Sequence, residues 1–163
     1  MSNTEVASDE HGHSHDHDVC IQEALDKAVD ICNERGIRLT FLRKRVLELV
    51  WQAHKPIGAY TILSQLSTDG RQVAPPTVYR ALDFLMEEGF VHRLTSLNAF
   101  IGCSEPGHSA HGQFLICTEC SEVAEMQDMG VIESIEACAA EKGFNVQGQI
   151  VEVVGICPMC QVK

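Results

Sequence analysis

Four cysteines are arranged as two pairs with the spacing of a metal-binding knuckle. Two residues separate Cys117 from Cys120, and the same spacing recurs at Cys157 and Cys160 near the end of the chain. This spacing lets both thiolates of a pair reach one ion without backbone strain, and two such pairs make a tetrahedral site. Closed four-thiolate sites are typical of structural zinc. The sequence therefore predicts a structural zinc held by these four residues.

A second group of metal-ligand side chains surrounds the first cysteine pair. It consists of His92, Cys103, His108, His111 and Glu125. Two imidazoles, one thiolate and one carboxylate from this group could form a second tetrahedral site of mixed ligands. The group lies where a basic part of the chain meets an acidic part. A metal bound here could fix the angle between two halves of the molecule.

Charge is distributed unevenly along the 163 residues, whose formal net charge is −11. Residues 36–93 contain eight Lys and Arg and five Asp and Glu. Residues 1–35 contain only two Lys and Arg but nine Asp and Glu, and residues 94–163 contain the same numbers. A local basic face is what contact with phosphates needs, so the net acidity does not exclude a nucleic-acid partner. This layout suits two small domains better than one.

The chain contains eight cysteines but no N-terminal apolar run that could be a signal peptide. No stretch approaches the length of a membrane span either. We therefore expect a cytoplasmic protein without a membrane partner, in which reduced thiols bind metal. Residues 1–18 are polar and carry four alternating histidines, so we expect a disordered tail. Its histidines fit either a weak metal chelator or a merely solvated segment.

Apolar periodicity predicts helices over residues 19–35, 41–52, 59–66 and 75–88, followed by strands over 90–94 and 99–103. The fourth helix opens with two prolines and leaves Thr77, Tyr79 and Arg80 outside its apolar stripe. Tyr79 and Arg80 lie in the first turns, where a recognition helix presents side chains to base edges. The pattern indicates a helix-turn-helix with a hairpin wing, although an ordinary helical hairpin is the alternative.

The remainder of the chain reads as a small α/β unit. Strands are expected over 114–117, 122–126 and 144–156, and a helix capped by Asp128 over 130–142. Such a unit exposes strands that it cannot cover alone, which predicts dimerisation. The fold class expected is therefore α+β.

Four sequence segments together resemble the ferric uptake regulator family, and within it the zinc uptake regulators: PPTVYRALDFL, GFVHR, LICTEC and GICPMC. The resemblance extends from about residue 19 to the C-terminus. It implies a homodimeric repressor with an N-terminal winged helix-turn-helix domain over 19–102. A hinge then leads to a metal-binding dimerisation domain over 103–163. The resemblance also implies that the metal-loaded dimer binds an AT-rich palindromic operator and represses zinc-uptake genes.

The resemblance further assigns site residues. Cys117, Cys120, Cys157 and Cys160 correspond to structural zinc ligands, and His92, Cys103, His111 and Glu125 to regulatory ones, which gives two Zn²⁺ per subunit. His111 is preferred to His108 because it lies nearer the strand and is held more rigidly. A thiolate at Cys103 suits zinc better than iron or manganese. The residues that correspond to DNA contacts are Tyr79 and Arg80 for bases, and Arg38, Thr40, Arg43 and Lys55 for the backbone.

Other functions fit the sequence less well. The chain has no HExxH helix, nucleophile elbow or phosphate-binding loop, and two matched cysteine pairs favour metal binding over redox chemistry. We therefore expect no enzyme and no small-molecule substrate. A zinc-trafficking protein would have no need of Tyr79 and Arg80. A repressor of the same family that senses iron or manganese is the remaining alternative.

Overall fold

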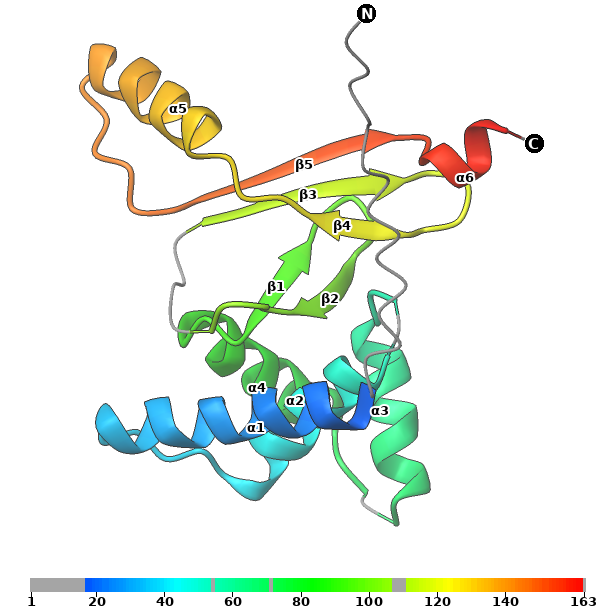
Figure 1. Cartoon of the computed structure of the whole chain (residues 1–163). Helices are drawn as coiled ribbons and strands as arrows, with labels where there is room; N and C mark the ends of the chain where they lie inside the picture. Colours follow the sequence, from blue (N-terminus) through cyan, green and yellow to red (C-terminus); the bar gives the residue numbers. More distant parts are fainter. Residues whose placement is uncertain (1–16, 54, 71, 107–110, 163) are drawn as a thin grey trace, which may run out of the picture.

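The computed structural model describes residues 17–53, 55–70, 72–106 and 111–162 (Figure 1). The expected tail over residues 1–18 lies outside the described residues except for its last two positions. These two positions already belong to the first helix, which begins at His17 rather than Val19.

The described residues of the N-terminal half form four helices and a hairpin, as the apolar periodicity predicts. They are α1 (His17–Glu34), α2 (Phe41–Gln52), α3 (Ala59–Thr68), α4 (Pro75–Glu87), β1 (Val91–Leu94) and β2 (Ala99–Gly102). Thr40 caps α2, and Pro75 occupies the first turn of α4, where its missing N–H costs nothing. Gly89 ends the turn after α4 at φ +76°, a conformation that glycine adopts without strain.

One apolar core holds these elements together. Fully buried side chains of α2, α3 and α4, such as Val46, Ile62 and Leu82, pack with Phe90 ahead of β1. Trp51 at the end of α2 lies against Gly102 at the end of β2. A Cβ on that glycine would be only 2.5 Å from the Trp51 Cε2 atom. The core therefore reaches the residue that precedes Cys103.

In the C-terminal half, the residues that the structure describes form a three-stranded sheet and two helices. These are β3 (His111–Cys117), β4 (Val123–Glu125), α5 (Met129–Glu141), β5 (Gln149–Gly155) and α6 (Pro158–Gln161). The strand order is β4-β3-β5, with β3 antiparallel to β4 and parallel to β5. The strand expected over 144–156 is shorter than predicted, because 144–148 connect α5 to β5, and α6 was not expected.

The two faces of this sheet have different surroundings. Phe114 and Ile116 are buried and pack with Leu94 of β1, so one face rests on the wing. Leu115 and Val153 are paired in the β3–β5 register and point to the other face, where their side chains are 44% and 46% exposed. The wing accordingly lies between the helical half and the sheet, while α5 projects from one end of the sheet (Figure 1).

None of the helices in the described part of the chain is long and apolar enough to cross a membrane.

Candidate metal centres and nucleic-acid interface

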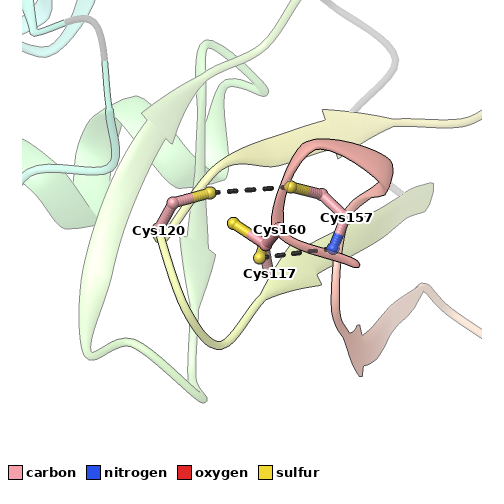
Figure 2. A group of neighbouring side chains, drawn as sticks. All are labelled: Cys117, Cys120, Cys157 and Cys160. Atoms are coloured by element: carbon pink, nitrogen blue, oxygen red, sulfur yellow. Dashed lines mark hydrogen bonds between the residues drawn. The ribbon is translucent and has the colours of Figure 1, made fainter. Parts of the chain in front are cut away.

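The two cysteine pairs meet at one end of the C-terminal sheet (Figure 2). Cys117 is the last residue of β3, and Cys120 lies in the turn that leads to β4. Cys157 caps the start of α6, and Cys160 lies within that helix. The four sulfur atoms all lie within 4.8 Å of one another, and the Cys120 and Cys157 sulfurs are 3.7 Å apart. A tetrahedron with Zn–S bonds of about 2.3 Å has edges of about 3.8 Å. The cluster therefore fits a tetrahedral zinc ion.

The cysteine cluster is electrostatically prepared for a cation. The Cys157 N–H donates to the Cys117 sulfur at 3.3 Å, and hydrogen bonds of this kind lower the pKa of Cys117 to about 6. The pKa of Cys160 is raised to about 12, chiefly by its contact with the Cys157 side chain. One thiolate is thus stabilised while a neighbouring thiol resists ionisation. A divalent cation would supply the charge that four adjacent thiolates need.

The second group of predicted ligands lies between the wing and the sheet. His92 is on β1, 5% exposed, with its ring edge-on to Phe114 at 5.3 Å. Its Nε2 atom is buried and has no hydrogen-bond partner among the described residues. Cys103 follows β2 and is also buried, with its sulfur 3.2 Å from the Glu105 carbonyl oxygen. A buried imidazole nitrogen without a partner is suited to a metal ligand.

Glu125 approaches this group from the end of β4. Its Oε2 accepts a hydrogen bond from the Ser104 hydroxyl at 2.6 Å, and Glu125 and Cys103 line one cavity of about 220 Å³. Gly112 lines the same cavity, and a Cβ added to it would lie 2.7 Å from Phe114 and 3.4 Å from His92 Nδ1. The start of β3 therefore passes close to the His92 ring.

Burial sets the protonation of this group. It lowers the pKa of His92, against the opposing effect of the Glu125 charge, so the imidazole stays neutral as a metal ligand must be. Burial also raises the pKa of Cys103 to about 11, and Glu125 adds to that shift. An imidazole, a thiol and a carboxylate are together a donor set that zinc accepts.

The structure does not draw this second set together as closely as the cysteines. Within the described part of the chain, the four cysteines are the only group of three or more potential metal ligands whose donor atoms all lie within 4.8 Å of one another. His111 begins β3 and is paired with Gln149, but its side chain is not among the described atoms, and His108 lies outside the described residues. The fourth ligand thus stays a prediction.

The side chains expected to read bases are presented by α4. Tyr79 is 42% exposed and Arg80 is exposed, while Thr77 in the first turn is half-buried. Near the start of α2, Arg38 is exposed and the Thr40 hydroxyl accepts the Arg43 N–H at 3.4 Å. Tyr79, Arg80 and Arg38 therefore have surfaces open to a nucleic acid.

Two of the predicted phosphate-contacting cations have partners inside the protein. The Arg43 guanidinium lies 3.6 Å above the Phe84 ring and donates to the Arg38 carbonyl oxygen at 2.7 Å. The Lys55 ammonium donates to the Cys120 carbonyl oxygen at 2.8 Å. Lys55 thus connects the loop after α2 to the cysteine cluster, a contact that the sequence did not predict.

Sequence reasoning also missed Ser104 and Glu152. Glu152 lies on β5, and its carboxylate accepts hydrogen bonds from the wing turn between β1 and β2. A single carboxylate in the otherwise apolar run IVEVV was the available signal. Ser104 had no signal beyond its position next to Cys103.

Known proteins resemble the chain in both sequence and structure. The zinc uptake regulation protein of Escherichia coli (strain K12) is 39% identical over 142 residues, which cover 85% of this chain and 82% of that protein. The crystal structure of holo XcZur superimposes with a TM-score of 0.80 at 43% identity, covering 86% of this chain and 99% of that one. A zinc uptake regulator complexed with zinc and DNA also superimposes with a TM-score of 0.80, at 38% identity. The match covers 87% of this chain and 95% of that one.

These structures confirm the expected winged helix with a C-terminal α/β domain. The model of the ferric uptake regulator family matches residues 34–154, which is most of the chain. This chain therefore belongs to the ferric uptake regulator family.

Proposed function

We propose that this protein is a zinc-responsive transcriptional repressor, which binds an AT-rich palindromic operator as a zinc-loaded dimer and represses zinc-uptake genes. The observation that carries the proposal is the placement of His92 and Cys103 on the wing side, and Glu125 on the sheet side, of one interface. The similarity to a zinc uptake regulator complexed with zinc and DNA supports it. The protein is a regulator and not an enzyme.

Two zinc ions per subunit are proposed. Cys117, Cys120, Cys157 and Cys160 would hold the structural ion, as their sulfur spacing supports. His92, Cys103, His111 and Glu125 would hold the regulatory ion, with His108 as the alternative to His111. Reduced thiols at both sites suit the cytoplasm.

Regulation would follow from ligands contributed by both sides of the wing–sheet interface. His92 lies on the wing of the DNA-binding domain, proposed as residues 19–102. Cys103 and His111 lie in the hinge that opens the dimerisation domain, proposed as residues 103–163, and Glu125 lies further inside that domain. Bound zinc would join the four donors and favour one arrangement of the two domains. A dimer reads a palindrome only when its two recognition helices match the half-site spacing, so this arrangement is the one that binds DNA.

A second copy of this chain is the proposed partner for the outer face of the sheet. Leu115 and Val153 are exposed on this face. Phe144, on the segment that leads into β5, is 74% exposed. Apolar side chains exposed on a sheet are typical of a surface that a partner covers.

The decisive experiment titrates binding of the full chain to an AT-rich palindromic duplex against chelator-buffered free zinc, beside Fe(II) and Mn(II). We expect zinc to switch binding on at the lowest free concentration, because the Cys103 thiolate favours it. Tighter operator binding with iron or manganese would move the protein to another branch of the family. Binding that ignores all three metals would refute a metal-dependent repressor.

Tyr79 and Arg80 are proposed to contact bases, and Arg38 and Thr40 the backbone. Thr77 is proposed as a further DNA-binding residue. Arg43 and Lys55 stay in the proposed contact set, although each would have to share its protein partner with a phosphate.

The Arg80→Ala variant is expected to weaken operator binding about tenfold, as removal of a base-contacting arginine does. Its affinity for an unrelated duplex should change less, because base contacts specify sequence. Fluorescence anisotropy with both duplexes measures the two effects. Lys142→Ala removes the same charge at the end of α5 and should leave both affinities unchanged. Equal losses on the two duplexes would mean that Arg80 contacts phosphate only.

A further inference from the structure

The turn of the wing is held to the C-terminal sheet by one carboxylate. Glu152 Oε1 accepts the Thr95 N–H at 2.6 Å, and Glu152 Oε2 accepts the Ser96 N–H at 2.9 Å. Each carboxylate oxygen therefore has its own backbone donor. Hydrogen bonds to an ionised acceptor are about twice as strong as neutral ones.

The position of Glu152 in the sheet explains this contact. Glu152 is paired with Phe114 in the β3–β5 register, so both side chains project from the same face. Phe114 packs against Leu94, the residue that precedes Thr95. Burial raises the pKa of Glu152, but the hydrogen bonds from Ser96 and Thr95 outweigh it and leave the pKa below its ordinary value. The contact is thus an ionised carboxylate at the border of a small apolar cluster.

This contact restrains the hairpin that carries two of the proposed regulatory ligands. His92 is on β1, paired with Ile101 of β2, and Cys103 directly follows β2. The other two proposed ligands, His111 and Glu125, are on the sheet. If the turn left the sheet, the hairpin could pivot and separate the two halves of the donor set. Glu152 itself lies outside that donor set.

A second link joins the same two parts of the molecule. Lys55, in the loop after α2, donates to the carbonyl oxygen of Cys120 in the turn between β3 and β4. One contact at the wing turn and one near the cysteine cluster restrain the DNA-binding half more than either alone. The Glu152 contact is the one made by the turn between β1, which carries His92, and β2, which leads directly to Cys103.

We propose that Glu152 is a positioning residue for the regulatory zinc site, which holds the wing against the sheet so that ligands on both sides are preorganised for one ion. The inference rests on the proposed function, because it presupposes that His92, Cys103 and Glu125 bind zinc. Preorganisation increases affinity by reducing the ordering that binding must impose.

The test compares Glu152→Gln with the wild type in a competition titration against a chromophoric zinc chelator. Glutamine keeps the shape but loses the charge and replaces one acceptor with a donor. We expect the second zinc to bind about tenfold more weakly, the effect of weakening one charge-assisted hydrogen bond. Zinc bound to the four cysteines should be unaffected. Amide hydrogen exchange at Thr95 and Ser96 should accelerate, and operator affinity should return to the wild-type value at saturating zinc.

Two further variants separate positioning from a general structural effect. Glu141→Gln removes a carboxylate charge at the end of α5 and should behave as the wild type. Glu152→Asp keeps the charge but shortens the side chain, so its zinc affinity should lie between those of the wild type and Glu152→Gln. Co(II) substituted for zinc should give absorption bands at the wild-type energies in every variant, because no ligand changes.

The outcomes distinguish this inference from the proposed function. Unchanged affinity of Glu152→Gln for the second zinc would overturn the inference. A wild type that binds two zinc ions without any effect on DNA affinity would refute the proposed function, while the zinc titration would still decide the role of Glu152. A wild type that binds only one zinc would refute both.

Discussion

Cys117→Ser is expected to release the structural zinc and to unfold the C-terminal sheet. Cys117 joins the end of β3 to α6 through the four-cysteine cluster, and no side chain of α5 is buried enough to replace that support. Zinc binding to closed structural sites contributes roughly 10–16 kcal/mol, which is comparable to the total stability of about 5–15 kcal/mol of an ordinary domain. Zinc content, far-UV circular dichroism and size-exclusion chromatography should show the loss of one zinc, of strand signal and of the dimer.

Cys138→Ser provides the matched control. Cys138 is an exposed cysteine on α5, outside both proposed metal sites. This variant should retain full zinc content and fold. A stable Cys117→Ser dimer with wild-type zinc content would show that the cluster is not the structural site.

Cys103→Ser is expected to abolish the zinc response while the protein stays folded. Serine is close to cysteine in size but lacks the soft sulfur that zinc prefers. Burial raises the pKa of the Cys103 thiol to about 11, so near neutral pH it is protonated until a cation displaces the proton. At a free zinc concentration that saturates the wild type, operator affinity should fall by about 100-fold or more, because loss of an outer-shell partner alone already costs about 10–100-fold at metal sites.

Anisotropy titrations at fixed free zinc measure this loss, and thermal unfolding checks that the structural site persists. Cys138→Ser again serves as the control and should respond to zinc as the wild type does. A Cys103→Ser protein that still switches with zinc would remove Cys103 from the regulatory site. In that case His92 and Glu125 would have to act with other donors.

Local patterns were sufficient to predict most of the fold. α2 and α4 occur at nearly the expected bounds, because their signals act between neighbours in sequence. These signals are the cap at Thr40, the proline pair that begins at Pro75 and the apolar spacing of both helices. The segment over 144–148 has no strand beside it in the described part of the chain, where the β3–β5 pairing begins at His111, opposite Gln149. Strand pairing is a long-range property, which explains why β5 starts later than predicted.

The candidate sites were predictable to the extent that ligand chemistry is encoded in spacing. The matched cysteine pairs brought four sulfurs together as expected. The partners of Lys55 and Arg43 were not predictable, because their positive charges suit a carbonyl oxygen or an aromatic ring as well as a phosphate. The contact of Glu152 with the wing depends on which face of β5 meets the turn, which the register alone decides.

Trp51 is the only tryptophan in the chain, and its indole lies against Gly102, one residue before Cys103. A displacement of Gly102 together with Cys103 would change the surroundings of this ring. The tryptophan emission of the unlabelled protein therefore originates beside the proposed regulatory site. Stopped-flow measurement of Trp51 fluorescence after mixing with zinc would therefore give the rate of zinc binding and of any domain movement that follows, without an added label.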